Sequence, residues 1–129
     1  MSESTLSTKR VLSVGQCFAD HSSISRVLRA SFVAEVIAAD TSRQALQQLQ
    51  EETFALVLVN RVFDADGDSG LDLIRAIKAD DALRSVPVML VSNYDEAQAQ
   101  AVQAGALPGF GKAALGQPHM LARVESYLR

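Results

Sequence analysis

The chain alternates between short apolar runs and longer segments in which apolar residues recur at every third or fourth position. The apolar runs cover residues 10–14, 32–37, 54–59, 86–91 and 107–111. Most of their residues are apolar, rather than every second one, which is typical of parallel strands that helices cover on both faces. The periodic segment after each run predicts a helix. This order predicts an α/β domain of the (βα)5 type, with short connections and one parallel sheet.

Residues at the ends of the periodic segments support the helix assignments. The candidate N-caps are Asp20, His21 or Ser22, then Thr41 or Ser42, and then Asp68 or Ser69. Gly105 can adopt the left-handed conformation that ends the fourth helix, and Pro118 suits the first position of the last one. Pro108 and two glycines interrupt the run at 107–111, so we expect the fifth strand to be short or irregular.

Length and composition indicate a single globular domain. The chain has 129 residues, of which 48% are hydrophobic, enough for one core. Residues 1–8 are polar and without periodicity, which predicts a flexible tail, and residues 9–129 are expected to form the domain.

Polar residues follow four of the five predicted strands, namely the first, third, fourth and fifth. Ligands of open parallel sheets bind outside the carboxyl ends of the strands, so the residues at these ends are the first candidates for chemistry. Asn60 ends the third strand, in the segment TFALVLVNRVFDADGDSGLDLIRAIK at 53–78. The other candidates are Gly15 and Gln16 after the first strand, Ser92 after the fourth and Lys112 after the fifth.

The segment at 53–78 resembles the phosphoacceptor segment of the response regulator receiver (CheY-like) family, and the resemblance extends over residues 10–129. It implies a flavodoxin-like doubly wound sheet with strand order 2-1-3-4-5. In that family the third strand ends in an Asp that takes a phosphoryl group from a histidine kinase, and Asn60 stands at this position. Gly15 and Gln16 stand where two acidic residues hold a divalent cation. Ser92 and Lys112 match the hydroxyl residue and the lysine that contact the phosphoryl oxygens.

These replacements predict a receiver without the family's chemistry. A carboxamide has no anion with which to attack phosphorus. Mg²⁺ needs carboxylate oxygens, and all three expected acids are missing, so we expect no metal and no cofactor. Gly109 stands where the family has a switch aromatic, and Ala113 stands where it has a proline. We expect Ser92 and Lys112 to make local hydrogen bonds instead, with Lys112 bound to the side-chain carbonyl of Asn60.

Other candidate sites fail on their own patterns. The segment DADGDSGLD at 64–72 is similar to a calcium loop, but an EF-hand needs glycine at Ser69 and glutamate at Arg75. The single cysteine, Cys17, cannot form an internal disulfide and has no neighbouring Lys or Arg, which favours an inert thiol over a redox sensor.

A net charge of −3 gives no basic stripe for nucleic acid. The sequence shows no apolar segment long enough for a signal peptide or a membrane span, so we expect a cytoplasmic protein.

Two functional hypotheses follow. The first is a pseudo-receiver that acts in two-component signal transduction by phosphorylation-independent contact with a protein partner or a second copy, through the fourth helix, fifth strand and fifth helix. Its expected exposed contact residues are Tyr94, Gln98, Gln103, Pro108, Phe110 and Tyr127. The alternative is a non-covalent sensor of a small anion or metabolite that uses Ser92 and Lys112. An enzyme is disfavoured because the acid, base and nucleophile are missing.

Overall fold

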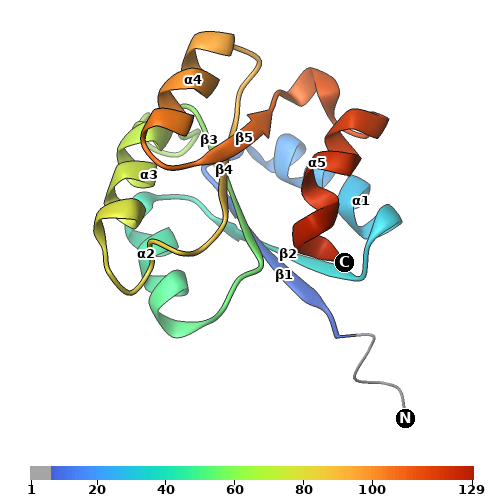
Figure 1. Ribbon diagram of the computed structural model, residues 1–129, viewed down its shortest axis with the longest axis horizontal. Coiled ribbons are helices and arrows are strands. Elements are labelled where there is room, and N and C mark those ends of the chain that lie inside the picture. The colour runs from blue at the N-terminus through green and yellow to red at the C-terminus, as the bar shows by residue number, and fades with distance from the viewer. Residues whose placement is uncertain (1–6) are drawn as a thin grey trace.

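The computed structural model describes residues 7–129, which form one parallel five-stranded sheet flanked by helices (Figure 1). The strands are β1 (Lys9–Val14), β2 (Ala34–Ala39), β3 (Leu56–Asn60), β4 (Val88–Val91) and β5 (Leu107–Phe110), in the order β2-β1-β3-β4-β5. The helices are α1 (Phe18–Ser31), α2 (Ser42–Glu51), α3 (Gly70–Ala79), α4 (Asp95–Gln103) and α5 (Pro118–Leu128), with a 3₁₀ turn η2 at Lys112–Ala114. The predicted fold class and strand order are confirmed.

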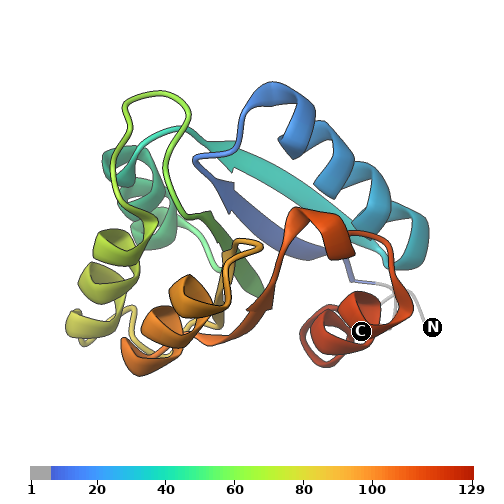
Figure 2. The same ribbon diagram turned by 90° about the horizontal axis from the view of Figure 1, so that it is seen from above.

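The helices form two layers, one on each face of the sheet. Figure 2 shows α1 and α5 on one side and α2, α3 and α4 on the other. Successive residues of β3 point to opposite layers: Leu56 and Leu58 pack with α1 and α5, whereas Val57 and Val59 pack with α2 and α3. All four side chains are fully buried, which explains why β3 is a continuous apolar run.

The register places the carboxyl ends of three strands at one level. Val14 of β1 pairs with Val59 of β3, and Asn60 pairs with Val91 of β4. The residues that follow these strands therefore meet at the same edge of the sheet. The pairing of β4 with β5 is irregular, because the register shifts between Met89 and Val91. The short, irregular fifth strand is as the sequence predicts.

Helix boundaries follow the caps. Thr41 Oγ1 accepts a hydrogen bond from Gln44 N at 3.2 Å, and Ser69 Oγ accepts one from Asp72 N at 3.3 Å. The expected start of α1 near Asp20 is wrong by one turn, because the Cys17 thiol caps the helix by accepting from Asp20 N at 3.4 Å. Sulfur is a weak acceptor, so the sequence gives little sign of this cap.

Other boundaries shift by one or two residues. The second strand begins at Ala34 instead of residue 32, and the fourth begins at Val88, after Pro87. Of the predicted tail, residues 1–6 lie outside the described part of the chain, and residues 7 and 8 belong to no helix or strand. Within residues 7–129, none of the helices has the length and apolar character needed to cross a bilayer.

Candidate functional site

Three of the predicted site residues meet at the carboxyl edge of the sheet. Asn60, Ser92 and Lys112 line a cavity of about 300 Å³, together with residues that follow β3 and β4. β3, β4 and the η2 turn position them, in that order. They lie at the carboxyl ends of the strands, where the strand order predicts a crevice.

Both polar atoms of the Asn60 side chain are hydrogen-bonded to the surrounding backbone. Its Nδ2 donates to the carbonyl oxygens of Gly15 at 3.0 Å and Val62 at 2.8 Å. Its Oδ1 accepts from Arg61 N at 3.1 Å. Both amide hydrogens are used, and Asn60 thereby joins the β1–α1 turn to the β3–α3 loop. A carboxylate could not donate either bond, so this arrangement is specific to the amide.

A phenyl ring occupies the space beside Gly15. The residue has φ +77°, and a Cβ there would lie 2.2 Å from Cδ1 of Phe63. Phe63 is only 1% exposed. The Gly15 carbonyl also accepts from Asp64 N at 2.9 Å, which fixes the loop that carries the ring. No side chain fits at position 15 unless Phe63 moves.

Gln16 adds no charge to this region. It is 7% exposed, and neither atom of its amide has a hydrogen-bond partner among residues 7–129. Within the same residues, no three His, Cys, Asp or Glu side chains come together in a way that could hold a metal ion. The divalent cation that the receiver fold implies does not fit here, because Mg²⁺ requires carboxylate oxygens and positions 15, 16 and 60 offer none.

Lys112 is held by an acidic residue that the sequence did not single out as a partner. Its Nζ lies 2.6 Å from Oδ2 of Asp20 in the first turn of α1. The hydrogen bond from Lys112 lowers the pKa of Asp20 below its usual value, with a smaller contribution from Cys17, although partial burial opposes the shift. The expected bond from Lys112 to the Asn60 carbonyl is wrong, because Lys112 pairs instead with the carboxylate of Asp20, which attracts an ammonium more strongly than an amide does.

Ser92 and its neighbour organise the loop after β4. Ser92 is 8% exposed, and its Oγ accepts from Tyr94 N at 3.1 Å, next to the start of α4. Asn93 Oδ1 accepts from Ala113 N at 3.1 Å and so ties this loop to the η2 turn. The local hydrogen-bonding role expected for Ser92 is what the structure shows.

Gly109 is fixed from both sides by Gln98 and Arg123. The sequence suggested Gln98 only as an exposed contact residue, and it did not single out Arg123. Gln98 of α4 inserts its amide between β4 and β5: Oε1 accepts from Gly109 N at 3.1 Å, and Nε2 donates to Leu90 O at 2.9 Å and Ser92 O at 3.1 Å. Arg123 of α5 donates to the Gly109 carbonyl. A Cβ on Gly109 would lie 2.1 Å from Leu90 O, so only glycine fits. We call Gln98, Gly109 and Arg123 the clamp.

The clamp explains the register shift between β4 and β5. The Gln98 amide takes the place of direct backbone hydrogen bonds at this point of the ladder, and it links α4, β4 and β5. In the sequence, Gln98 lies between two alanines of a predicted helix, a pattern that predicts a solvent-exposed side chain. Only the glycine at 109 gave a signal, since glycine within a strand marks close approach of another chain segment.

Three of the expected partner-contact residues are less exposed than predicted, and a fourth lies on another face. Phe110 is 4% exposed and belongs to the core under α5, and Tyr127 is partly buried against the same cluster. Both were predicted to be exposed and are not, because these side chains point to the sheet face that α1 and α5 cover. Gln98 is half-buried in the clamp, and Tyr94 lines a groove on the opposite side of α4.

An exposed groove does exist where the partner face was expected. It has a volume of about 750 Å³ and lies between α4, β5 and the start of α5, with Ala99, Val102 and Pro108 among its apolar lining residues. Val102 is 44% exposed, and Gln103 and Pro108 are exposed as predicted. The clamp forms the floor of this groove, since all three of its residues line it.

Comparison with solved structures identifies the architecture. A putative response regulator from Chloroflexus aurantiacus superposes with a TM-score of 0.83 at 20% identity, covering 95% of this chain and 98% of that one. The chain has the receiver fold. A response regulator from Thermotoga maritima gives 0.72 at 24% identity, covering 95% and 98%. The chemotaxis response regulator CheY4 of Vibrio cholerae gives 0.72 at 18% identity, covering 95% and 100%. No protein-family model and no curated protein sequence matches the chain.

Proposed function

We propose that this receiver-fold domain works in a two-component-type pathway by phosphorylation-independent contact with a protein partner, and that it is not an enzyme. The observation that carries the proposal is the hydrogen bonding of Asn60. The residue at the tip of β3 acts as a structural link between Gly15 and Val62, at distances of 3.0 and 2.8 Å. Its amide nitrogen carries no lone pair suited to attack, and its oxygen is occupied by Arg61 N.

The surroundings of Asn60 also lack the means to support phosphoryl transfer. Such transfer depends on a metal that neutralises the developing charge on the phosphoryl oxygens. Gly15 and Gln16 supply no carboxylate, and the Phe63 ring fills the space beside Gly15. Of the two basic residues that line the cavity, Lys112 is paired with Asp20, and Arg61 lies over the ring of Tyr94. Pairing with Asp20 supports a structural role for this lysine.

The proposed contact surface is the groove between α4, β5 and α5. The clamp holds its floor in one arrangement, because the Gly109 N–H and carbonyl are both bound by side chains from the flanking helices. A surface that is already ordered loses little conformational freedom on binding. The domain would therefore present this groove to its partner constantly, with no phosphorylation step to switch it.

Intact-mass measurement after incubation with acetyl phosphate and Mg²⁺ tests the proposal. A receiver that retains its acidic residues, treated in parallel, should gain the mass of a phosphoryl group, and this protein should not. A heavier species that disappears in an Asn60→Ala variant would overturn the proposal, because it would place a covalent phosphoryl group on this residue.

A second candidate function rests on the cavity at Ser92 and Lys112. With about 300 Å³ and two basic lining residues, Arg61 and Lys112, it could hold a small anion without covalent chemistry. The anion would have to compete with Asp20 for Lys112. Thermal shift measurements with phosphate, sulfate and nucleotides distinguish this sensor from the protein-contact function, because a ligand that binds the folded state raises the melting temperature. An Asp20→Asn variant should strengthen such binding.

A further inference from the structure

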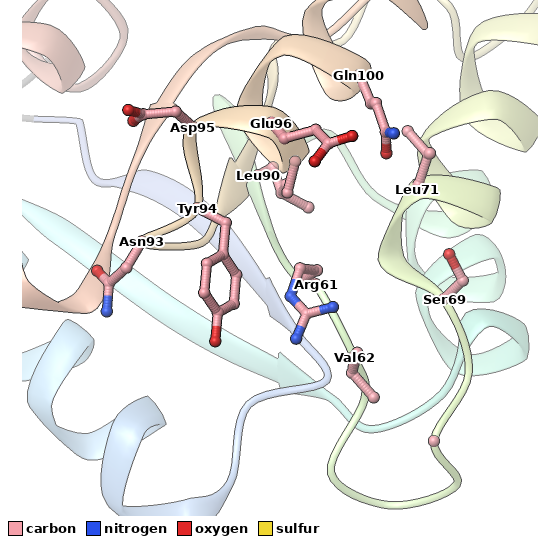
Figure 3. A pocket seen from close by; sticks show the side chains of 12 residues that line it. Arg61, Val62, Ser69, Leu71, Leu90, Asn93, Tyr94, Asp95, Glu96 and Gln100 are labelled. Atoms are coloured by element: carbon pink, nitrogen blue, oxygen red, sulfur yellow. The ribbon is translucent and has the colours of Figure 1, made fainter.

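A second groove lies on the other side of α4, separate from the proposed contact surface. It has a volume of about 790 Å³ and runs between the loop at 61–70, the start of α3 and the first turns of α4 (Figure 3). Only Asn93 and Asp95 line both grooves, because the body of α4 stands between them. We call it the α3–α4 groove.

Apolar side chains form the floor and part of the rim of the α3–α4 groove. Leu90 is buried at its base, and Leu71 and Ala97 are partly buried on its two walls. Val62 is 44% exposed at the rim. Exposed apolar side chains gathered in a concave site are typical of a surface that binds another molecule.

One aromatic residue marks the end of the groove that faces the Asn60 cavity. Tyr94 is 62% exposed, and the guanidinium of Arg61 lies over its ring, 4.9 Å from the centroid. Both residues also line the Asn60 cavity. Arg61 is the one Lys or Arg among the residues described as lining the α3–α4 groove, and Tyr94 already engages it.

Carboxylates outnumber basic side chains in and around the groove. Asp95 and Glu96 line it beside Arg61, and four further exposed aspartates lie in the flanking segments: Asp64, Asp66, Asp68 and Asp72. Residues 61–75 and 93–100 carry six exposed carboxylates and two arginines, a formal charge of −4, while the whole chain has a charge of −3. The rest of the chain is therefore close to neutral. Figure 3 shows that Glu96 and Gln100 point from α4 toward Leu71 of α3, so at least one carboxylate extends across the groove.

We propose that the α3–α4 groove binds a basic amphipathic segment of a partner protein. Apolar side chains of that segment would enter between Leu71 and Ala97, and its lysines or arginines would face Glu96 and the carboxylates of the loop. Complementary charge of this kind steers association and selects among partners of similar shape. The domain then carries two protein-binding grooves, one on each side of α4.

Two synthetic peptides of equal length test the assignment. One places leucines at helical spacing with lysines between them, and the other has glutamates in place of the lysines. Binding to the full chain is followed by fluorescence anisotropy, and the site is mapped by amide NMR shifts. The lysine peptide should bind and shift Val62, Leu71 and Ala97, and the glutamate peptide should not bind. Affinity should fall as salt is added.

Substitutions locate the interaction. Glu96→Lys should weaken binding of the lysine peptide by about tenfold or more, which corresponds to at least one close charge pair. The control is Glu51→Lys, the same charge change on an exposed residue at the end of α2. It should change affinity by less than about twofold, since surface charges beyond a screening length act weakly. Val102→Asp, in the other groove, should leave the affinity unchanged.

Three outcomes would overturn the proposal. Equal losses in Glu96→Lys and Glu51→Lys would mean attraction to the acidic protein in general. Peptide-induced shifts confined to the groove at Val102 would assign the peptide to the other surface. Concentration-dependent dimerisation of the wild type that Glu96→Lys abolishes would make a second copy of this chain the occupant.

Discussion

The ring of Phe63 fills the space into which a side chain at Gly15 would project. The distance from a Cβ at Gly15 to Cδ1 of Phe63 would be 2.2 Å, and the backbone at Gly15 has φ +77°. The structure therefore leaves no room for a side chain at position 15. Replacing Gly15 with Asp would place a carboxylate against a buried phenyl group, so the substitution alone cannot restore a metal site.

The first prediction concerns the stability cost of a side chain at this position. Gly15→Ala should lower the free energy of unfolding by about 2–5 kcal/mol, because it combines the left-handed backbone penalty with overfilling of the core. Urea denaturation followed by circular dichroism measures the change.

Gly67 provides the matched control for Gly15. It has nearly the same φ, +74°, but nothing lies within 4 Å of its Cβ position. Gly67→Ala should therefore cost only the backbone penalty, about 1–2 kcal/mol. If the two variants lose the same stability, Phe63 moves at no cost in free energy and its ring does not exclude a side chain at position 15.

The second prediction tests the clamp. Gln98→Ala leaves the Gly109 N–H and the Leu90 carbonyl without their partners, so it should destabilise the fold by about 1–3 kcal/mol. Hydrogen exchange at the Gly109 amide should accelerate as well. Gln100→Ala makes the same substitution on the same helix at an exposed residue whose side chain makes no hydrogen bond within residues 7–129, and it should cost less than about 0.5 kcal/mol. Equal losses of stability in the two variants, with unchanged hydrogen exchange at Gly109, would show that the Gln98 side chain does not hold Gly109 in place.

Much of the fold was predictable because it depends on burial. A strand that is covered on both faces, such as β3, consists of consecutive apolar residues in the sequence. The helices have apolar residues at every third or fourth position. The position of Asn60 at the end of β3 follows from the same pattern. Boundaries were less predictable where weak or unusual groups decide them, as with the thiol of Cys17 at the start of α1.

The contacts within the site were less predictable, because they join residues far apart in the sequence. Nothing in the sequence near Lys112 identifies Asp20 as its partner, and Gln98 has no local feature that separates it from Gln100. The error at Phe110 has a different cause. In a four-residue strand at the sheet edge, alternation alone does not tell which face is buried, and the register shift beside it changes that face.

The third prediction is a pH dependence from the Asp20–Lys112 pair. Since the hydrogen bond to Lys112 lowers the pKa of Asp20 below 3.8, the pair stabilises the fold fully above that value, and its contribution is lost as the pH falls through the lower folded-state pKa. Both side chains are about a third exposed, so the contribution should be below about 1 kcal/mol.

Comparison of variants across pH measures this contribution. Asp20→Asn should be less stable than the wild type at neutral pH, and the difference should vanish in acid. Asp64→Asn changes an exposed residue that forms no ion pair with any of residues 7–129, and it should match the wild type at both ends of the range. A deficit in Asp20→Asn that persists in acid would show that the lost interaction is not the ion pair.

The last prediction separates the surface of the α4–β5–α5 groove from the core beneath it. Phe110→Ala should lower stability by about 3–5 kcal/mol, since the ring is 4% exposed, and reduced partner binding by this variant would only report unfolding. Val102→Asp changes an exposed residue of the groove and should leave the melting temperature nearly unchanged while it weakens partner binding.

Val33 is the control for Val102. It is 53% exposed and lies just before β2, at the opposite edge of the sheet from β5. Val33→Asp introduces the same charge and removes the same side chain, so any general effect of surface charge or solubility appears in both variants. Binding to an identified partner, measured by calorimetry, should fall in Val102→Asp and not in Val33→Asp. If both variants bind as the wild type does, then contact is made elsewhere, and the α3–α4 groove on the other side of the helix becomes the surface to test against the same partner.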